Sequence, residues 1–366
     1  MGRCGTLVVW FALAVLPASA APVAPEAALP PATIREISRI VTARMLRAKI
    51  PGLTVAVGTR TRLAWAQGFG TADVENSVAA ARDTAYRIGS ISKPITAVAV
   101  MQLADRGKLD LDAPVQQYLP GFPAKPWPIT ARLLLAHLSG IRHYRSEEEV
   151  ESTRHYTNLL DPLRVFANEP LLFEPGTNYS YSTYGYDLLG AVVESAAGMH
   201  FLDYLRANIF APAGMEHTGE DNVYVIVPHR ARGYRRNLEG GIENCALVDT
   251  SNKIPGGGLL STAGDLIRFA AALERGDLVK PATRDRMFAP QRTRDGRPVP
   301  YGLGWAVVEL DGKPWILHPG IQQGASACLL VSPATGLSVA VLANLEGVDM
   351  EPLAVRLAEI VLALGE

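Results

Sequence analysis

The chain has 366 residues, of which 48% are hydrophobic and 19% are charged, and its formal net charge is −1 at pH 7. This composition excludes a disordered chain, and the nearly neutral, scattered charge excludes the basic face of a nucleic-acid-binding protein. A chain of this length exceeds what one simple core usually holds, so we expect two lobes.

The first twenty residues have the pattern of a secretory signal peptide. Arg3 precedes an apolar run over residues 7–16, and the small-residue sequence A-S-A follows at residues 18–20. We therefore predict cleavage after Ala20 and a secreted or periplasmic protein. The apolar run is too short to span a bilayer, so no spanning segment is expected after cleavage. The alternative is an uncleaved anchor.

Beyond this segment, the pattern predicts strands at both ends of the domain and helices between them. Residues 21–32, rich in Ala and Pro, predict a flexible lead-in. Alternating and apolar runs predict strands at residues 52–58, 63–70, 304–309, 315–318, 327–331 and 337–343. Helical patterns occupy residues 95–104, 129–138, 186–197, 265–273 and 350–364.

This order predicts an α+β domain. The first and last thirds are expected to share one antiparallel sheet flanked by terminal helices, with the middle third as a helical insertion. We accordingly place one domain at residues 33–366. Its sheet lobe spans about 33–90 and 296–366, and its helical lobe about 91–295.

The stretch Ser90-Ile91-Ser92-Lys93 carries the first chemical signal. A short strand ending at Gly89 precedes it, and a helix that is apolar almost all round follows. Ser90 would then lie at a helix N-terminus with the Lys93 amine one turn on, where an amine can activate a hydroxyl nucleophile. The alternative is that Ser90 only caps the helix and Lys93 is solvated.

The second signal is Tyr181, in the sequence Tyr181-Ser182-Thr183. A phenol close to Ser90 and Lys93 would serve as a general base if neighbouring cations depressed its pKa. The alternative is that Tyr181 belongs to an aromatic packing cluster, because several tyrosines follow one another here.

The third signal is His318-Pro319-Gly320, at the end of a predicted strand. A histidine there would hold a substrate carboxylate or help to move a proton. Gly320 would let a ligand backbone approach closely. A structural histidine on a strand is the alternative.

The remaining motifs add no cofactor. The zinc, calcium and nucleotide-binding patterns are absent from the sequence, so we expect neither a metal nor a cofactor. A disulfide between Cys245 and Cys328 is left open. The acidic run at residues 147–149 is interpreted as a solvated loop.

Taken together, the motifs resemble the serine β-lactamase family of class C type, which includes DD-peptidases and esterases, and within it the LACTB-type proteins. The likeness runs from about residue 33 onwards. It is carried by the stretches RIGSISK, LLAHLSGIRHY, FEPGTNYSYSTYGYDLLG, IPGGGLLST and HPG. It implies a β-lactamase/transpeptidase-like fold: a mixed antiparallel sheet flanked by helices, with an inserted helical domain and the active site at their junction.

The resemblance also implies roles for individual residues. Ser90 matches the acylated serine, Lys93 its proton partner and Tyr181 a general-base candidate, while the N–H groups of Ser90 and Ile321 would form the oxyanion hole. The substrate-binding candidates are Thr183, His318, Gly320 and Ile321. Whether Lys93 or Tyr181 takes the proton stays open.

Three departures from the family pattern affect the substrate site. Thr183 stands where the family usually has Asn and so lacks the paired amide donor and acceptor. Pro319 replaces Ser or Thr and lacks both a hydroxyl and an N–H. Ile321 replaces a small residue and narrows the cleft. These changes leave acyl-enzyme chemistry intact but weaken an assignment to β-lactam hydrolysis.

The sequence therefore predicts a secreted serine hydrolase that acts through an acyl-enzyme on a small peptide, amide or ester. The alternatives are an esterase of the same family, or a non-catalytic relative that binds cell-wall peptides or assembles into filaments. The expected partner is a small-molecule or peptide substrate, and the oligomeric state is unknown.

Overall fold

The computed structural model describes residues 29–364. The predicted signal peptide and residues 21–28 of the predicted lead-in lie outside these residues. The first element is helix α1 (Pro31–Ala48), which begins with proline at its first position, where the missing N–H has no helical partner to lose. Within the described range, no helix is both long and apolar enough to cross a bilayer.

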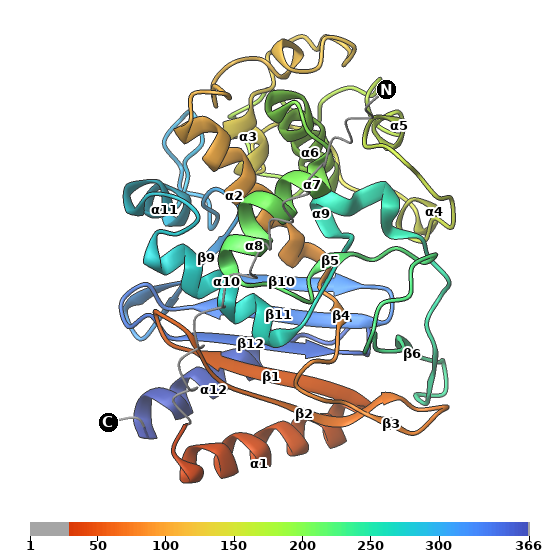
Figure 1. Ribbon diagram of the computed structural model, residues 1–366. Coiled ribbons are helices and arrows are strands. Elements are labelled where there is room, and N and C mark those ends of the chain that lie inside the picture. Colours follow the sequence, from red (N-terminus) through yellow and green to blue (C-terminus); the bar gives the residue numbers. More distant parts are fainter. Residues whose placement is uncertain (1–28, 365–366) are drawn as a thin grey trace, which may run out of the picture.

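A seven-stranded sheet forms the lower half of the molecule (Figure 1). Its strands run in the order β3-β2-β1-β12-β11-β10-β9, and each neighbouring pair of strands is antiparallel. The bounds are β1 (Gly52–Gly58), β2 (Leu63–Asp73), β3 (Val78–Ala79), β9 (Ala306–Leu310), β10 (Lys313–Gln322), β11 (Ala325–Val331) and β12 (Ser338–Ala343). Because β1 pairs directly with β12, the first and last thirds share one sheet, as predicted.

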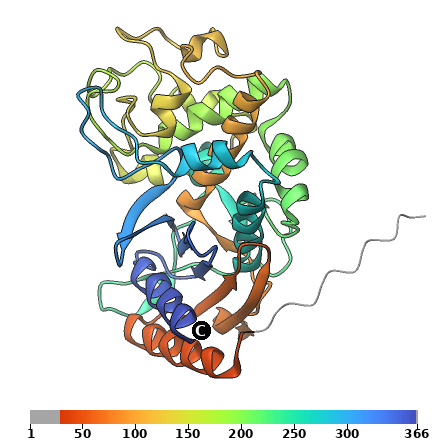
Figure 2. The same cartoon turned by 90° about the vertical axis from the view of Figure 1, so that its left-hand side faces the viewer.

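Helices cover both faces of this sheet (Figures 1 and 2). Val55 and Val341 point toward α1 and the C-terminal helix α12 (Glu351–Leu364). Their neighbours Ala56 and Leu342 point to the opposite face, which is covered by α10 (Ala263–Arg275). Successive strand residues face opposite sides, so strands buried on both faces are apolar throughout.

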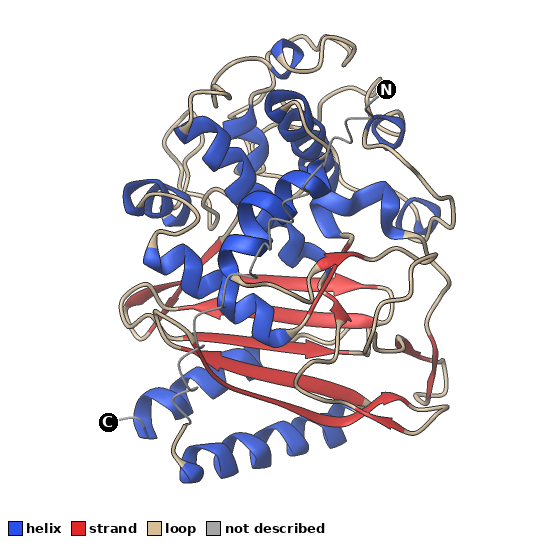
Figure 3. Ribbon diagram, viewed as in Figure 1, coloured by secondary structure: helices blue, strands red, loops and turns tan. Residues whose placement is uncertain are grey.

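The upper lobe is mainly helical (Figure 3). It contains α2 (Ser92–Asp105), α3 (Ala131–Leu135), α4 (Glu147–Val150), α5 (Leu160–Leu163), α6 (Thr183–Ala197), α7 (Phe201–Leu205), α8 (Ala211–Ala213), α9 (Ile254–Gly257) and α11 (Pro281–Phe288). Short turns η1 (Gly89–Ile91), η2 (Val115–Gln117), η3 (Arg206–Phe210) and η4 (Thr250–Lys253) connect them. Small strands complete the chain: β4 (Tyr86–Arg87), β5 (Gly219–Glu220), β6 (Tyr234–Arg236), β7 (Ile242–Asn244) and β8 (Leu259–Ser261). The α+β prediction is confirmed.

Three local predictions were wrong. Residues 31 and 32, which were assigned to the flexible lead-in, form the start of α1. The helix expected over residues 129–138 ends at Leu135, and two residues later His137 adopts a left-handed backbone with φ 58°. The acidic run is not a loop but the short helix α4, and Glu149 forms an ion pair with Arg142, which is only 4% exposed. A buried guanidinium needs such a partner.

The junction between the two lobes depends on two glycines. A Cβ at Gly320 on β10 would lie 2.0 Å from the Ile88 carbonyl oxygen, and one at Gly89 would lie 2.6 Å from the Ile321 carbonyl oxygen. The sequence prediction that Gly320 admits a ligand backbone is therefore corrected: the close neighbour is the chain's own segment before η1. This contact sets Ser90 against the edge of β10.

We predict that Gly320→Ala destabilises the protein by about 1–3 kcal/mol, because the added methyl group meets rigid backbone. Gly121→Ala is the matched control, since a Cβ there meets nothing within 4 Å. Urea unfolding of both variants checks this. Equal unfolding midpoints for the two variants would contradict the proposed contact.

Candidate active site

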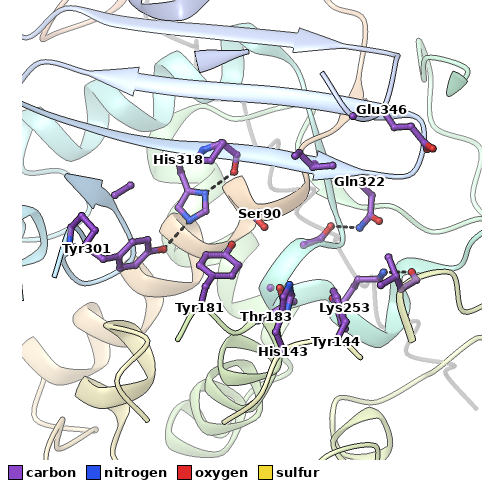
Figure 4. A pocket seen from close by; sticks show the side chains of 18 of the residues that line it. Ser90, His143, Tyr144, Tyr181, Thr183, Lys253, Tyr301, His318, Gln322 and Glu346 are labelled. Carbon is purple, nitrogen blue, oxygen red and sulfur yellow. Dashed lines mark hydrogen bonds between the residues drawn. The ribbon is translucent and has the colours of Figure 1, made fainter. Parts of the chain in front are cut away.

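Ser90 and Lys93 meet at the junction between the lobes because turn η1 leads directly into α2. Lys93 Nζ donates a hydrogen bond to Ser90 Oγ at 2.9 Å, and Ser90 is partly exposed while Lys93 is completely buried. In Figure 4, Ser90 lies between the His318 side of the cavity and Tyr181. The alternative of a solvated Lys93 is therefore wrong.

Lys93 is held by three separate segments. Besides Ser90, its Nζ donates to Thr183 Oγ1 at 3.1 Å and to the Gly256 carbonyl at 2.6 Å. Burial lowers the pKa of Lys93 to about 7, although the nearby negative charge of Asp187 raises it. Near neutral pH, a large share of Lys93 is thus an uncharged amine whose lone pair can accept the Ser90 hydroxyl proton.

Tyr181 lies just before α6, with its ring centroid 4.8 Å from Lys93 Nζ, and the Ser90 hydroxyl acts on its phenol. One edge of Tyr181 faces the cavity, but the packing around it disfavours the phenolate and raises the pKa of Tyr181 well above 10. The expectation that nearby cations depress this pKa is therefore wrong. The arrangement favours Lys93 as the base and Tyr181 as a proton donor.

Thr183 begins α6, whose N-terminus is capped by Ser182 accepting a hydrogen bond from the Gly185 N–H. The Thr183 hydroxyl accepts from Lys93, and its N–H donates to His143 Nδ1 at 3.3 Å. Although Thr183 lines the cavity, it is 4% exposed. Its visible contacts therefore position Lys93, and its contact with substrate stays a prediction.

His318 lines the cavity but is not a cation. Its Nδ1 bonds to the Pro319 carbonyl at 2.7 Å, so Nδ1 carries the proton and Nε2 accepts from the Tyr301 hydroxyl at 2.8 Å. Burial lowers the pKa of His318 to about 3. The structure therefore gives His318 no charge with which to hold a substrate carboxylate at neutral pH.

These side chains surround a cavity of about 820 Å³. Its walls are largely aromatic and aliphatic, and the residues that form them include Tyr144, Tyr179, Tyr301, Pro300, Val307 and Val308. Ile321, 62% exposed, projects from β10 beside them. The polar end carries Gln322, Gln323 and Glu346 (Figure 4). A mostly apolar pocket with a few convergent polar groups is typical of a small-molecule site.

Three buried residues at this site were not predicted from the sequence: His137, Asp187 and Lys253. His137 Nδ1 accepts a hydrogen bond from the Ser182 N–H at 3.1 Å and its ring lies 4.3 Å from the Tyr181 ring, so it orients this segment. Asp187 and Lys253 lie beneath Lys93 and influence its charge. One of them, Asp187, could have been found from the sequence, because it is a charged residue within the apolar run of α6.

In residues 29–364, no cluster of three or more His, Cys, Asp or Glu side chains is arranged to hold a metal ion. Cys245 and Cys328 are both free thiols, so the disulfide left open by the sequence is not formed.

Comparison with known proteins agrees with this geometry. The sequence profile of the family described as Beta-lactamase matches residues 37–362. The chain belongs to the beta-lactamase family of serine hydrolases. It is 31% identical to human "Serine beta-lactamase-like protein LACTB, mitochondrial", over 93% of this chain and 83% of that protein.

A second relative and one solved structure also resemble the chain, and the structure shows the fold. Penicillin-binding protein 4* of Bacillus subtilis is 31% identical over 72% of this chain and 61% of its own length. The structure of an octameric penicillin-binding protein homologue from Pyrococcus abyssi matches with a TM-score of 0.79 at 24% identity, over 91% of this chain and 78% of that one. The predicted β-lactamase/transpeptidase-like fold is confirmed.

We predict that acylation of this beta-lactamase relative accelerates as pH rises through about 7, because Lys93 must lose its proton to act as a base. A pH profile of kcat/KM on a nitrophenyl ester measures this rise. Burial lowers the pKa of His143 to about 4 and that of His318 to about 3. A rise centred near those lower values would instead assign the base to a histidine.

Proposed function

We propose that this serine hydrolase acts through an acyl-enzyme on a small uncharged amide, peptide or ester. In the proposed reaction, Ser90 Oγ attacks the substrate carbonyl while its proton passes to the Lys93 amine. Tyr181 donates a proton to the departing oxygen or nitrogen and is reprotonated from Lys93, and water then hydrolyses the ester formed on Ser90. The observation that carries this proposal is the hydrogen bond from the fully buried Lys93 to Ser90.

The developing negative charge on the substrate carbonyl needs donors at the junction. We propose the backbone N–H groups of Ser90 and Ile321 for this role. The close approach of Gly89 to the Ile321 backbone supports it, because it brings the two segments to one side of the cavity. Such donors typically contribute several kcal/mol to transition-state stabilisation.

The cavity walls support an uncharged substrate. Pro319 occupies the strand position where the family has Ser or Thr, and it is exposed to the cavity without offering a hydroxyl. The neighbouring His318 is neutral. The aromatic and aliphatic walls instead favour an apolar acyl group. These features favour an ester or amide without a carboxylate at the position where a β-lactam carries one.

We also propose that the protein is exported, on the basis of the charged, apolar and small-residue pattern in residues 1–20. N-terminal sequencing of protein purified from the producing cells tests this. A mature chain that begins at Ala21 supports export with cleavage, and an intact Met1 in the purified protein contradicts cleavage after Ala20.

We predict that Ser90→Ala abolishes covalent labelling by a fluorophosphonate and lowers ester turnover roughly 10³-fold or more. Ser92→Ala is the matched control, because Ser92 Oγ bonds to the Gly89 carbonyl and not to Lys93. That variant should still be labelled. Persistent labelling of Ser90→Ala would refute the assignment, and an unlabelled wild-type protein would favour the non-catalytic binding or filament-forming alternative.

We further predict slow turnover of a chromogenic cephalosporin beside measurable hydrolysis of nitrophenyl esters. Pro319→Thr should raise cephalosporin acylation about tenfold, which corresponds to about 1.4 kcal/mol of transition-state stabilisation from a restored hydroxyl. Stopped-flow acylation rates of the two proteins provide the measurement. Fast cephalosporin hydrolysis by the unmodified protein would show that Pro319 does not limit this activity.

A further inference from the structure

Two charged side chains, Asp187 and Lys253, lie buried near Lys93, and Lys253 also forms part of the cavity wall. Asp187 is 3% exposed and lies on α6 one turn after Thr183, so both side chains face the same way. Lys253 is 2% exposed and ends η4 just before α9. Its Nζ donates to the Val150 carbonyl at 2.5 Å and lies 5.2 Å from the centre of the Tyr144 ring (Figure 4).

Gly256 connects Asp187 to Lys93 through a single residue. Its N–H donates to Asp187 Oδ1 at 3.2 Å, and its carbonyl accepts from Lys93 Nζ at 2.6 Å. A Cβ at Gly256 would lie 2.5 Å from Thr183 Cγ2 and 2.9 Å from Asp187 Oδ1, so this backbone is pressed against α6. The geometry therefore holds the Asp187 carboxylate at a fixed place close to Lys93.

Asp187 Oδ2 is buried without a hydrogen-bond partner. A buried carboxylate oxygen in this position is costly unless opposite charges compensate for the lost water. Lys93 and Lys253 are the two cations whose charges act on it. The three groups thus form a buried arrangement of one acid and two amines, of which only Lys93 contacts the nucleophile.

The other titratable groups around Lys93 are neutral in the working pH range. They come from the segment after α3, from the start of α6 and from β10, and are His137, His143, Tyr181, Tyr186 and His318. Burial lowers the pKa values of the three histidines and raises those of the two tyrosines, so none carries charge near pH 7. Asp187 and Lys253 are the remaining neighbours, and both change charge in the same pH range as Lys93.

We propose that Asp187 and Lys253 are positioning residues of opposite effect, which together set the pH at which Lys93 gives up its proton and can activate Ser90. The negative charge of Asp187 holds the proton on Lys93, and the positive charge of Lys253 drives it off. This inference rests on the acyl-enzyme mechanism proposed above. Neither side chain is hydrogen-bonded to Ser90, so the proposed effect of each on Ser90 passes through Lys93.

The electrostatic effects of the two residues on Lys93 have the directions that this proposal requires. Asp187 raises and Lys253 lowers the pKa of Lys93, while burial is the larger cause of its depression. Burial also raises the pKa of Asp187 to about 7 and lowers that of Lys253 to about 8. The three groups therefore titrate in one pH range.

The test uses two single variants with opposite expected shifts. Asp187→Asn retains an acceptor for the Gly256 N–H and removes the negative charge. The midpoint of the rise of kcat/KM with pH, called the acid limb, should therefore shift to lower pH by about one unit. Lys253→Met keeps the unbranched stem and removes the positive charge, so that limb should move up by a similar amount. A purely structural defect would lower activity without opposite shifts.

The double variant Asp187→Asn/Lys253→Met should return the limb toward its wild-type position, because the two effects cancel. Asp203→Asn is the matched control, since it makes the same chemical change at an exposed residue of α7, and it should leave the limb in place. Thermal unfolding confirms that each variant is folded. If the two single variants are folded and their acid limbs have the same midpoint pH, the proposal is overturned.

A direct titration separates this inference from the proposed function. The chain has only seven lysines, so a ¹³Cε-lysine NMR titration can follow Lys93 itself, assigned with Lys93→Arg. Lys93 should titrate at lower pH in Asp187→Asn and at higher pH in Lys253→Met. An unmoved titration overturns the inference even if Ser90 is labelled. A shifted titration in a protein that no fluorophosphonate labels upholds the inference and refutes the acyl-enzyme function.

Discussion

The burial of the Lys93 amine is the constraint on which the site depends. A charged ammonium in that position loses its hydration, and only three oxygen acceptors from separate segments replace it. Those acceptors lie before α2, at the start of α6 and on α9. Two helical segments must therefore dock against α2 before the amine is accommodated, so the site is a product of the assembled lobes rather than of one motif.

The same docking explains why glycines cluster near the site. Gly89 and Gly320 let the segment around η1 approach β10, and Gly256 lets α9 approach α6. In each case a Cβ would collide with backbone or with a buried side chain. The nucleophile, its amine partner and the strand edge are thus brought together by close backbone contacts, which tolerate little displacement.

The electrostatic character of the cavity follows from the same burial. Histidines and tyrosines that would titrate in water are kept neutral by their packing, so these side chains add no charge to a mostly apolar cavity. The Tyr301 hydroxyl and His318 Nε2 form a hydrogen bond with each other. His318 therefore has no charge with which to hold a substrate carboxylate, which agrees with the loss of a hydroxyl at Pro319.

Sequence periodicity and spacing determined the α+β class, the shared sheet and the adjacency of Ser90 and Lys93, because strand alternation and one helical turn are local properties. The ends of helices were predicted less accurately, because His137 has a left-handed backbone within a run whose pattern is helical. Only the tertiary structure decided the charge states. The pKa of Tyr181 rises where the sequence suggested depression, and Glu149 pairs with Arg142 instead of facing solvent. Likewise, Asp187 and Lys253 reach Lys93 from segments distant in the chain. Desolvation and Coulomb interactions depend on which segments meet in space, and local sequence does not contain that information.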